Sequence, residues 1–490
     1  MDNLIQLVGK LKKSEVRLIR SLLEVQSLNQ KSHRLELFNL IHSKMAKTNL
    51  EASMEIYQKK PNAVYYVLKS RLKSDIINSM LYKKASQIFP TDYIKAKMNC
   101  RKWLMQGSML INRKIDGEGL SILHRAQQLA EQFDLPGEQA LINETLRNYY
   151  VVREGVQTMN RYKVLIHENN DMYEKHIEAS NYVLTMSIPT LFKAVYSVDK
   201  RKLYRHLQKL EKIYQSTKGE SDRIAFYYHL GYINYYILTK QFNKAKKICL
   251  DFFPLVKNSI SLNTLSNNGG SHFKMTSVLF RLEEFEEALS YANKTLDIFR
   301  EQTFNQLLAY EYCFLGNYYN NNYNQSVEIF NTVQGIQQLK SSKIREEKWS
   351  YLGAYNYYKL GNTGKSKELL DNCKNLTENK SGWYLGKKLL LLMISIKEKQ
   401  SNPTIIQLEN ILKLFRNLEE EYTQRFKSIY KVVRFLAYNQ FDFNLTYQKQ
   451  KYHLDLLKEG DSNYIWNPLG YEMIRFDEWF MNQVDLRGSN

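Results

Sequence analysis

A short string near residue 360 has the residue types of a phosphate-binding loop. Gly364, Lys365 and Ser366 follow one another as at the end of a P-loop. A nucleotide-binding P-loop also needs a glycine five residues before this one and a strand that presents the loop to phosphate. Position 359 is Lys359, and the residues before it have a helical pattern. We therefore interpret the string as a turn between two helices and predict no nucleotide cofactor.

Other local motifs for catalysis or metal binding do not occur in the sequence. The nine histidines show neither His-x3-His nor His-Glu-x2-His spacing, so we predict no zinc site. Gly-x-Ser-x-Gly and Gly-x-Gly-x-x-Gly are missing as well. The four cysteines are widely separated, which favours buried thiols in a reducing compartment; they are Cys100, Cys249, Cys313 and Cys373. We expect a non-catalytic, cytoplasmic protein without a cofactor or a metal.

The tripeptide Asn-Tyr-Tyr is the recurring polar feature of the chain. It occurs at 148–150, 234–236, 317–319 and 356–358. An asparagine side chain offers both a donor and an acceptor, so one asparagine per repeat could hold the backbone of an extended peptide. The adjacent tyrosines are the alternative lining of such a groove. The predicted peptide-binding residues are Asn148, Tyr149, Asn234, Tyr235, Asn317, Tyr318, Asn356 and Tyr357.

A second marker repeats with a period near 40 residues. An aromatic residue, two polar residues and a small residue precede an apolar helix; the small residues are Ala245, Ala288, Ser326 and Ser366, and the last copy lacks the aromatic residue. Each period reads as two helices joined by a turn. A small residue where the two helices cross allows their backbones to approach. Because one helix pair cannot bury its apolar side alone, the stack of pairs must be long.

The segment 347–372 resembles the tetratricopeptide repeat (TPR). Trp349, Leu352, Gly353 and Tyr357 follow that family's pattern, although Tyr357 is one residue late and the period exceeds the family's 34 residues. The resemblance implies an all-α fold, a right-handed superhelix of stacked antiparallel helix pairs. It also implies that the concave side binds a protein or peptide, in some members through an asparagine ladder.

We expect the repeats to span residues 91–460, with a long loop over Asn258–Ser271 where Gly269 and Gly270 interrupt the pattern. The aromatic-rich tail, 461–490, has two interpretations. It is a capping helix over 471–484 that covers the last repeat, or it is a segment that binds in the groove as a self-ligand.

The N-terminal region, 1–90, lacks the repeat and is predicted to hold four helices. In the last of these, beginning at Pro61, Val64, Leu68, Leu72, Ile76 and Met80 form an apolar stripe, and Lys69, Arg71 and Lys73 lie off it. Such a region could form a helix-turn-helix, so these three residues are the predicted nucleic-acid contacts. The arrangement is similar to bacterial regulators with a helix-turn-helix before a TPR-like sensor.

Composition and charge agree with this division. The 490 residues include only 20 Gly and 7 Pro, which argues against β-rich folds with many tight turns. Residues 1–114 hold 22 Lys and Arg against 8 Asp and Glu, so DNA or RNA is a possible partner there. The most apolar run, Leu389–Ile396, is too short to span a bilayer, and the N-terminus shows no signal-peptide pattern. Frequent Lys, Asn and Tyr are typical of an AT-rich bacterial genome.

These observations give two functional hypotheses. The first is a scaffold or adaptor that binds a protein or peptide on the concave side of a TPR-like superhelix. The alternative is a transcriptional regulator with a basic N-terminal DNA-binding region and a TPR-like sensor or dimerisation domain. The oligomeric state does not follow from the sequence.

Overall fold

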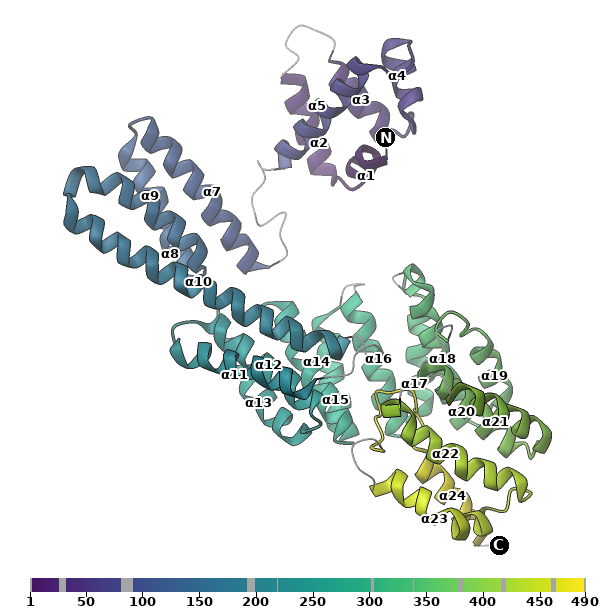
Figure 1. Ribbon diagram of the computed structural model, residues 1–490. Coiled ribbons are helices and arrows are strands. Elements are labelled where there is room, and N and C mark those ends of the chain that lie inside the picture. The colour runs from purple at the N-terminus through teal and green to yellow at the C-terminus, as the bar shows by residue number, and fades with distance from the viewer. Residues whose placement is uncertain are drawn as a thin grey trace. The chain divides into compact units, whose positions relative to one another are not determined.

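The computed structural model describes the chain in ten segments: 2–25, 32–80, 91–191, 199–217, 219–300, 304–337, 339–377, 382–415, 420–459 and 464–488. Within them the chain forms 23 α-helices, one 3-10 helix and no β-strand, which confirms the all-α prediction. The chain divides into two compact units, Met1–Gln106 and Gly107–Asn490 (Figure 1). The boundary lies inside α7 (Asp92–Asn112) and not at residue 90, and the tail belongs to the second unit.

The first unit folds around a core of its own. Its helices are α1 (Asp2–Gly9), α2 (Lys13–Val25), α3 (His33–His42), α4 (Asn49–Tyr57), α5 (Ala63–Met80) and the first part of α7. Ile19, Phe38, Tyr65 and Leu72 are buried together at the centre. Side chains cap the starts of several of these helices; Ser32 accepts from the backbone N–H of Leu35, for example, and Thr48 accepts from that of Glu51.

The buried stripe of α5 differs from the prediction at both ends. The structure buries Tyr65, Leu68, Leu72, Ile76 and Ser79, whereas Val64 is 59% exposed and Met80 is half-buried. A strict i, i+4 row turns about 40° around the helix at each step, so its ends leave the buried side.

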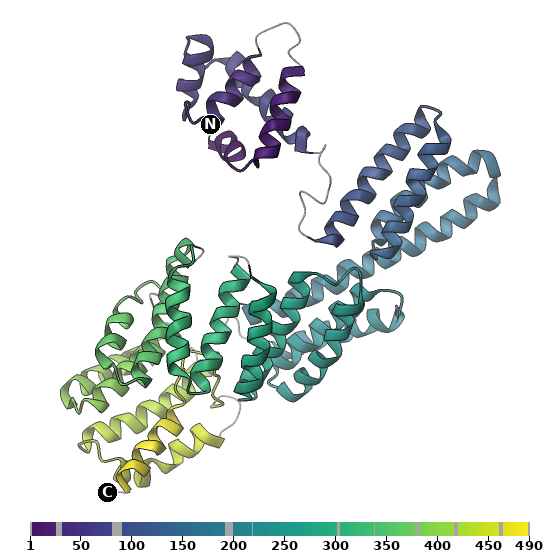
Figure 2. The same cartoon turned by 180° about the vertical axis from the view of Figure 1, so that it is seen from behind.

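The second unit is a stack of antiparallel helix pairs (Figures 1 and 2). After the end of α7 come α8 (Asp116–Gln132), α9 (Pro136–Glu154), α10 (Val156–Leu191), α11 (Lys200–Ser216), α12 (Asp222–Leu238), α13 (Phe242–Asn258), α14 (Leu265–Arg281), α15 (Phe285–Ile298), α16 (Phe304–Tyr319), α17 (Tyr323–Gln334), the 3-10 helix η1 (Leu339–Ser341), α18 (Lys343–Lys359), α19 (Thr363–Asp371), α20 (Gly382–Lys397), α21 (Ser401–Phe415), α22 (Glu420–Tyr438), α23 (Phe443–Glu459) and α24 (Phe476–Gly488). From α12 onward, the even-numbered member of each pair is called the first helix. This arrangement is that of a TPR-like α-solenoid.

The long helix α10 packs against α9 with one part and against α12 with another. Near its middle, the ring of Tyr173 lies against Gly137 of α9, whereas Val183 and Met186 lie against Gly231 of α12. A side chain at Gly231 would collide with Leu210 and Met186. Glycine is therefore needed where α12 meets α10 and α11.

The predicted small residues do lie where the helices of a pair cross. Ala245, Ala288, Ser326 and Ser366 have no exposed surface. The hydroxyl of Ser326 donates to the carbonyl of Phe314 at 3.2 Å, and that of Ser366 donates to the carbonyl of Ala354 at 2.8 Å. Both bonds join the second helix of a pair to the first, which confirms the role inferred from the sequence.

A residue with positive φ ends the first helix of each later pair and reverses the chain. These residues are Lys240, Glu283, Asn321, Gly361 and Lys399, followed by Gln440 and Phe441 after α22. Only Gly361 adopts this conformation without strain. Their positions mark the repeat independently of the sequence motifs.

The loop predicted over Asn258–Ser271 is wrong in its second half. Thr264 caps α14 by accepting from the backbone N–H of Asn267, and Gly269 and Gly270 lie inside the helix. A Cβ atom at Gly269 would lie 2.2 Å from the ring of Phe299. This glycine therefore makes room for an aromatic ring and does not break the helix.

None of the helices in the described part of the chain combines the length and the hydropathy that crossing a bilayer requires. Over the same residues, no three His, Cys, Asp or Glu side chains are grouped as a metal site would need.

Replacing Ala288 with Leu should lower the free energy of unfolding by about 1–3 kcal/mol, because a larger side chain cannot fit where the pair crosses. Urea unfolding followed by helical circular dichroism measures this. The exposed Glu286 on the same helix is the control site, and Glu286→Leu should change the value by less than about 0.5 kcal/mol. Equal unfolding of the two variants would contradict the close crossing.

Candidate functional site

The first helices of the solenoid bind a segment of the chain's own C-terminal region. Trp466 contacts the rings of Phe285 and Tyr319, and the hydroxyl of Tyr319 donates to the carbonyl of Pro468 at 2.6 Å. The hydroxyl of Tyr351 donates to the carbonyl of Tyr471. We call the side of α16, α18 and α20 on which segment 464–475 lies, and the equivalent side of α12 and α14, the inner face.

Both interpretations of the tail are partly correct. Helix α24 packs on α23 and covers the last pair, as a capping helix does. Residues 464–475, in contrast, lie on the inner face as a self-ligand would. Leu469, Met473, Phe476 and Phe480 are buried in the main core of the solenoid, so the tail is an integral part of the fold.

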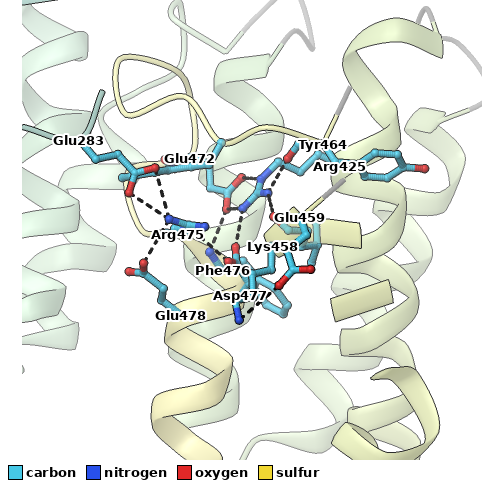
Figure 3. Close-up of polar contacts among 12 residues, drawn as sticks. Glu283, Arg425, Lys458, Glu459, Tyr464, Glu472, Arg475, Phe476, Asp477 and Glu478 are labelled. Atoms are coloured by element: carbon cyan, nitrogen blue, oxygen red, sulfur yellow. Dashed lines mark hydrogen bonds and ion pairs between the residues drawn. The ribbon is translucent and has the colours of Figure 1, made fainter. Parts of the chain in front are cut away.

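A buried arginine fixes the tail to α22 (Figure 3). The side chain of Arg425 forms a two-bond pair with Glu472, at 2.6 and 2.9 Å, and donates to Asp477 at 2.8 Å. Its remaining Nη1 donors bind the carbonyls of Leu457 and Tyr464. All five N–H groups of the guanidinium are therefore used.

The charges in this cluster support one another. Burial disfavours the charge of Arg425, but the carboxylates of Glu472 and Asp477 raise its pKa above the ordinary value. Glu472 also accepts from the backbone N–H of Phe476 at 2.9 Å, which fixes the start of α24. A second arginine, Arg475, reaches Glu283 in the turn between α14 and α15 at 3.0 Å (Figure 3).

Sequence analysis did not identify these residues. Arg425 and Glu472 are 47 positions apart, and Tyr351 and Tyr471 are 120 apart, so no local motif contains either pair. The signal that was present is the aromatic density of the tail, which correctly suggested that it is buried.

Two of the four predicted asparagines are buried between helices. Asn234 is fully buried; its Nδ2 donates to Ser187 of α10 at 2.9 Å, and its Oδ1 accepts from Lys274 of α14 at 2.7 Å. Asn356 is 1% exposed and donates to the carbonyl of Tyr323. Neither side chain is available to a peptide in the groove, so the ladder is wrong at these positions.

The remaining two asparagines point elsewhere. Asn317 donates to the carbonyl of Cys313 in its own helix, and Asn148 is exposed and accepts from Arg147.

The four asparagines diverge because they occupy different positions relative to the end of their helices. Each of these helices is followed by a residue of positive φ, and the distance from the asparagine to that residue differs between the copies. It is seven positions for Asn148, six for Asn234, four for Asn317 and five for Asn356. Each residue turns the helix by about 100°, so the four side chains diverge.

The predicted tyrosines are also displaced from the inner face by one residue in two copies. Tyr318 is 2% exposed, whereas the next residue, Tyr319, contacts the tail. Likewise Tyr357 is half-buried, and the following Tyr358 accepts from Nε1 of Trp479 at 3.0 Å. In the first two copies, Tyr235 is half-buried and Tyr149 donates to Asp116 of α8.

Two cations of α14 lie on the inner face. Lys274 lies nine positions before the turn residue Glu283, and Arg281 lies two positions before it. In the next pair, Tyr312 and Tyr319 lie nine and two positions before the equivalent turn residue, Asn321. This equivalence places both on the side where Tyr319 meets the tail. Lys274 donates to Asn234, and Arg281 donates to Ser277. In the described part of the chain, neither has a carboxylate within 4 Å.

The predicted nucleic-acid contacts lie on α5 of the first unit. Arg71 and Lys73 are exposed, whereas Lys69 is half-buried and donates to Oδ1 of Asn49 at 3.1 Å. Their role in nucleic-acid binding stays a prediction.

One cluster has the residue types of a hydrolase triad. Ser221, the N-cap of α12, donates to Oδ2 of Asp134 at 2.7 Å, which leaves its oxygen to accept from Nε2 of His176 at 2.8 Å. The same Nε2 lies 3.5 Å from Asp134, whereas a triad carboxylate binds the other ring nitrogen. Ser221 and His176 are buried, so the cluster connects α10 and α12 to the turn after α8.

Replacing Arg425 with Met should lower the free energy of unfolding by about 3–5 kcal/mol, because Glu472 and Asp477 lose their countercharge while buried. Urea unfolding checks this value. Arg434→Met removes an exposed arginine of the same helix and should change it by less than about 0.5 kcal/mol. A small effect of Arg425→Met would show that the tail is held by other contacts.

Acid should destabilise the second unit through His176. Burial and, secondarily, Arg223 lower the pKa of His176 below 6.5 despite Asp134, so the unfolded chain takes up this proton at a higher pH than the folded chain. Stability should therefore fall as pH drops below 6.5, by at most about 1.4 kcal/mol per pH unit for one histidine. Urea unfolding between pH 7 and 5 should give a smaller loss for His176→Gln. An equal loss of stability in the variant and in the unmodified chain would show that His176 does not cause the acid sensitivity.

Comparison with known proteins gives no family assignment. No family model matches the chain, and no curated protein matches it. The apo form of RapI is 13% identical with a TM-score of 0.43, over 69% of this chain and 85% of that chain. A signal transduction ATPase with a tetratricopeptide repeat sensor from Pyrococcus horikoshii is 12% identical with a TM-score of 0.43, over 86% of this chain and 66% of that chain. The helix pairs of residues 107–490 form a TPR-like α-solenoid.

Proposed function

We propose that the chain is a non-catalytic scaffold that binds a protein or peptide partner on the inner face of its solenoid. The observation that carries the proposal is that this face already binds a polypeptide segment. Tyr319 and Tyr351 donate to backbone carbonyls of residues 468 and 471, a contact that depends little on the side chains of the bound segment. The rings of Phe285, Tyr319 and Trp383 contact aromatic rings of the segment.

The tail itself is not the exchangeable partner. Its side chains belong to the main core, and the buried pair of Arg425 and Glu472 holds it. A partner therefore binds beside it, on the part of the inner face that α12 and α14 form.

Charge on this part of the face favours an acidic partner segment. Burial lowers the pKa of Lys274 to about 8 and also lowers that of Arg281. Both cations are half-buried, and their own partners are the neutral side chains of Asn234 and Ser277. A carboxylate from a bound segment would offset the cost of holding these charges away from water.

Affinity capture from a nuclease-treated native lysate tests the proposal. The variant Lys274→Gln with Arg281→Gln should recover partner proteins in amounts reduced about tenfold or more, since two charge-assisted contacts are lost. Quantitative mass spectrometry of the captured proteins is the measurement.

The matched control removes two exposed lysines from a second helix, as Lys244→Gln with Lys247→Gln on α13. Its net charge changes equally, and its capture should equal that of the unmodified chain. Equal capture by both variants would contradict binding at the inner face, and no specific capture by the unmodified chain would contradict the scaffold function.

A further inference from the structure

Helix α11 carries a dense row of exposed cations. Its 17 residues include six Lys or Arg and one acidic residue, Glu211. Arg201, Arg205, Lys209 and Lys212 recur at intervals of four, four and three on the exposed side, whereas Leu203, Leu207, Leu210 and Ile213 form the buried side. The row is about 17 Å long at 1.5 Å per residue.

The positive charge of the solenoid is concentrated in the part of the chain that runs from α11 to α13, and α11 alone holds six of these cations. Residues 115–490 are close to neutral in total, but residues 200–257 hold 13 Lys and Arg against 4 Asp and Glu. The acidic residues elsewhere in the stack offset this local excess in the total.

The charges of this row are not neutralised within the described structure. None of Arg201, Arg205, Lys209 and Lys212 has a carboxylate within 4 Å there, and Glu211 is engaged by Tyr232 and Gln215. The positive charge of the row also acts on the neighbouring His206. Burial lowers the pKa of this histidine most, and Lys202, Lys209 and Arg205 lower it further. A ligand for this surface must therefore bring several negative charges.

The residue types on this surface indicate which class of polyanion it binds: an acidic protein, a membrane surface or a nucleic acid. A protein interface needs an apolar centre, and insertion into a membrane surface needs exposed apolar side chains. On α11 the only large apolar side chain that is clearly exposed is Tyr204, at 50%, and it lies among the cations. Nucleic-acid interfaces are more polar and more positive than protein interfaces, and their aromatic residues stack on bases.

We propose that the exposed side of α11 binds nucleic acid, with Arg201, Arg205, Lys209 and Lys212 contacting successive phosphates and Tyr204 stacking on a base. The row is long enough to follow several phosphates of one strand. This surface is distinct from the inner face, so it does not depend on the scaffold function.

Fluorescence anisotropy with a labelled single-stranded oligonucleotide, and with a duplex of equal length, tests the proposal on the full chain. The variant with Gln at 201, 205, 209 and 212 should bind about tenfold or more weakly at about 50 mM salt. For single strands, the slope of log affinity against log salt should become shallower by up to about 3. Tyr204→Ala should weaken single-strand binding about fivefold or more while leaving duplex binding unchanged if stacking occurs.

Two control variants distinguish binding at α11 from an effect of total charge and from binding at the first unit. The variant with Gln at Lys431, Arg434, Lys449 and Lys451 removes four exposed cations from α22 and α23, and that with Gln at Arg71 and Lys73 removes two from α5. Both should bind the single strand at least about tenfold more tightly than the α11 variant. Circular dichroism verifies that all variants are folded.

The proposal is overturned if the unmodified chain does not bind at about 50 mM salt. It is also overturned if the α11 variant binds as tightly as the α22 and α23 control. Tighter binding of polyglutamate than of an oligonucleotide with equal charge would instead assign the surface to an acidic protein.

Discussion

The close crossing of the two helices in each pair is the constraint on which the solenoid depends. At Ala245, Ala288, Ser326 and Ser366, the absence of a large side chain brings the second helix against the first. In two pairs a serine hydroxyl also bonds to the carbonyl of the first helix. The pair then presents one apolar side to each neighbour, so burial of that side requires the next pair and the stack continues.

The end of the stack needs a different solution, and the tail provides it. Helix α24 covers the last pair, while segment 464–475 returns along the inner face. Arg425 makes this return specific, since its five donors meet two carboxylates and two carbonyls at fixed positions. The hydrogen bonds from Tyr319 and Tyr351 to carbonyls of this segment show how the first helices bind a polypeptide backbone.

Charge is distributed differently on the inner face and on α11. On the inner face, Lys274 and Arg281 are half-buried beside neutral partners, a setting that favours one or two carboxylates of an extended segment. On α11 the cations are exposed and regularly spaced, a setting that favours a long polyanion. The proposed partner segment and the proposed nucleic acid therefore contact two different kinds of surface.

The sequence by itself determined the helix pairs, their period and the small residues at the crossings, because these follow from local periodicity and from side-chain size. It also indicated that the aromatic tail is buried. Only the tertiary structure decided which side of each helix faces the groove, because one residue of register turns a side chain by about 100°. That rotation buried Asn234 and Asn356 and placed Tyr319 and Tyr358 on the inner face. It also decided the pairing of Arg425 with Glu472, since contacts between distant residues leave no local pattern in the chain.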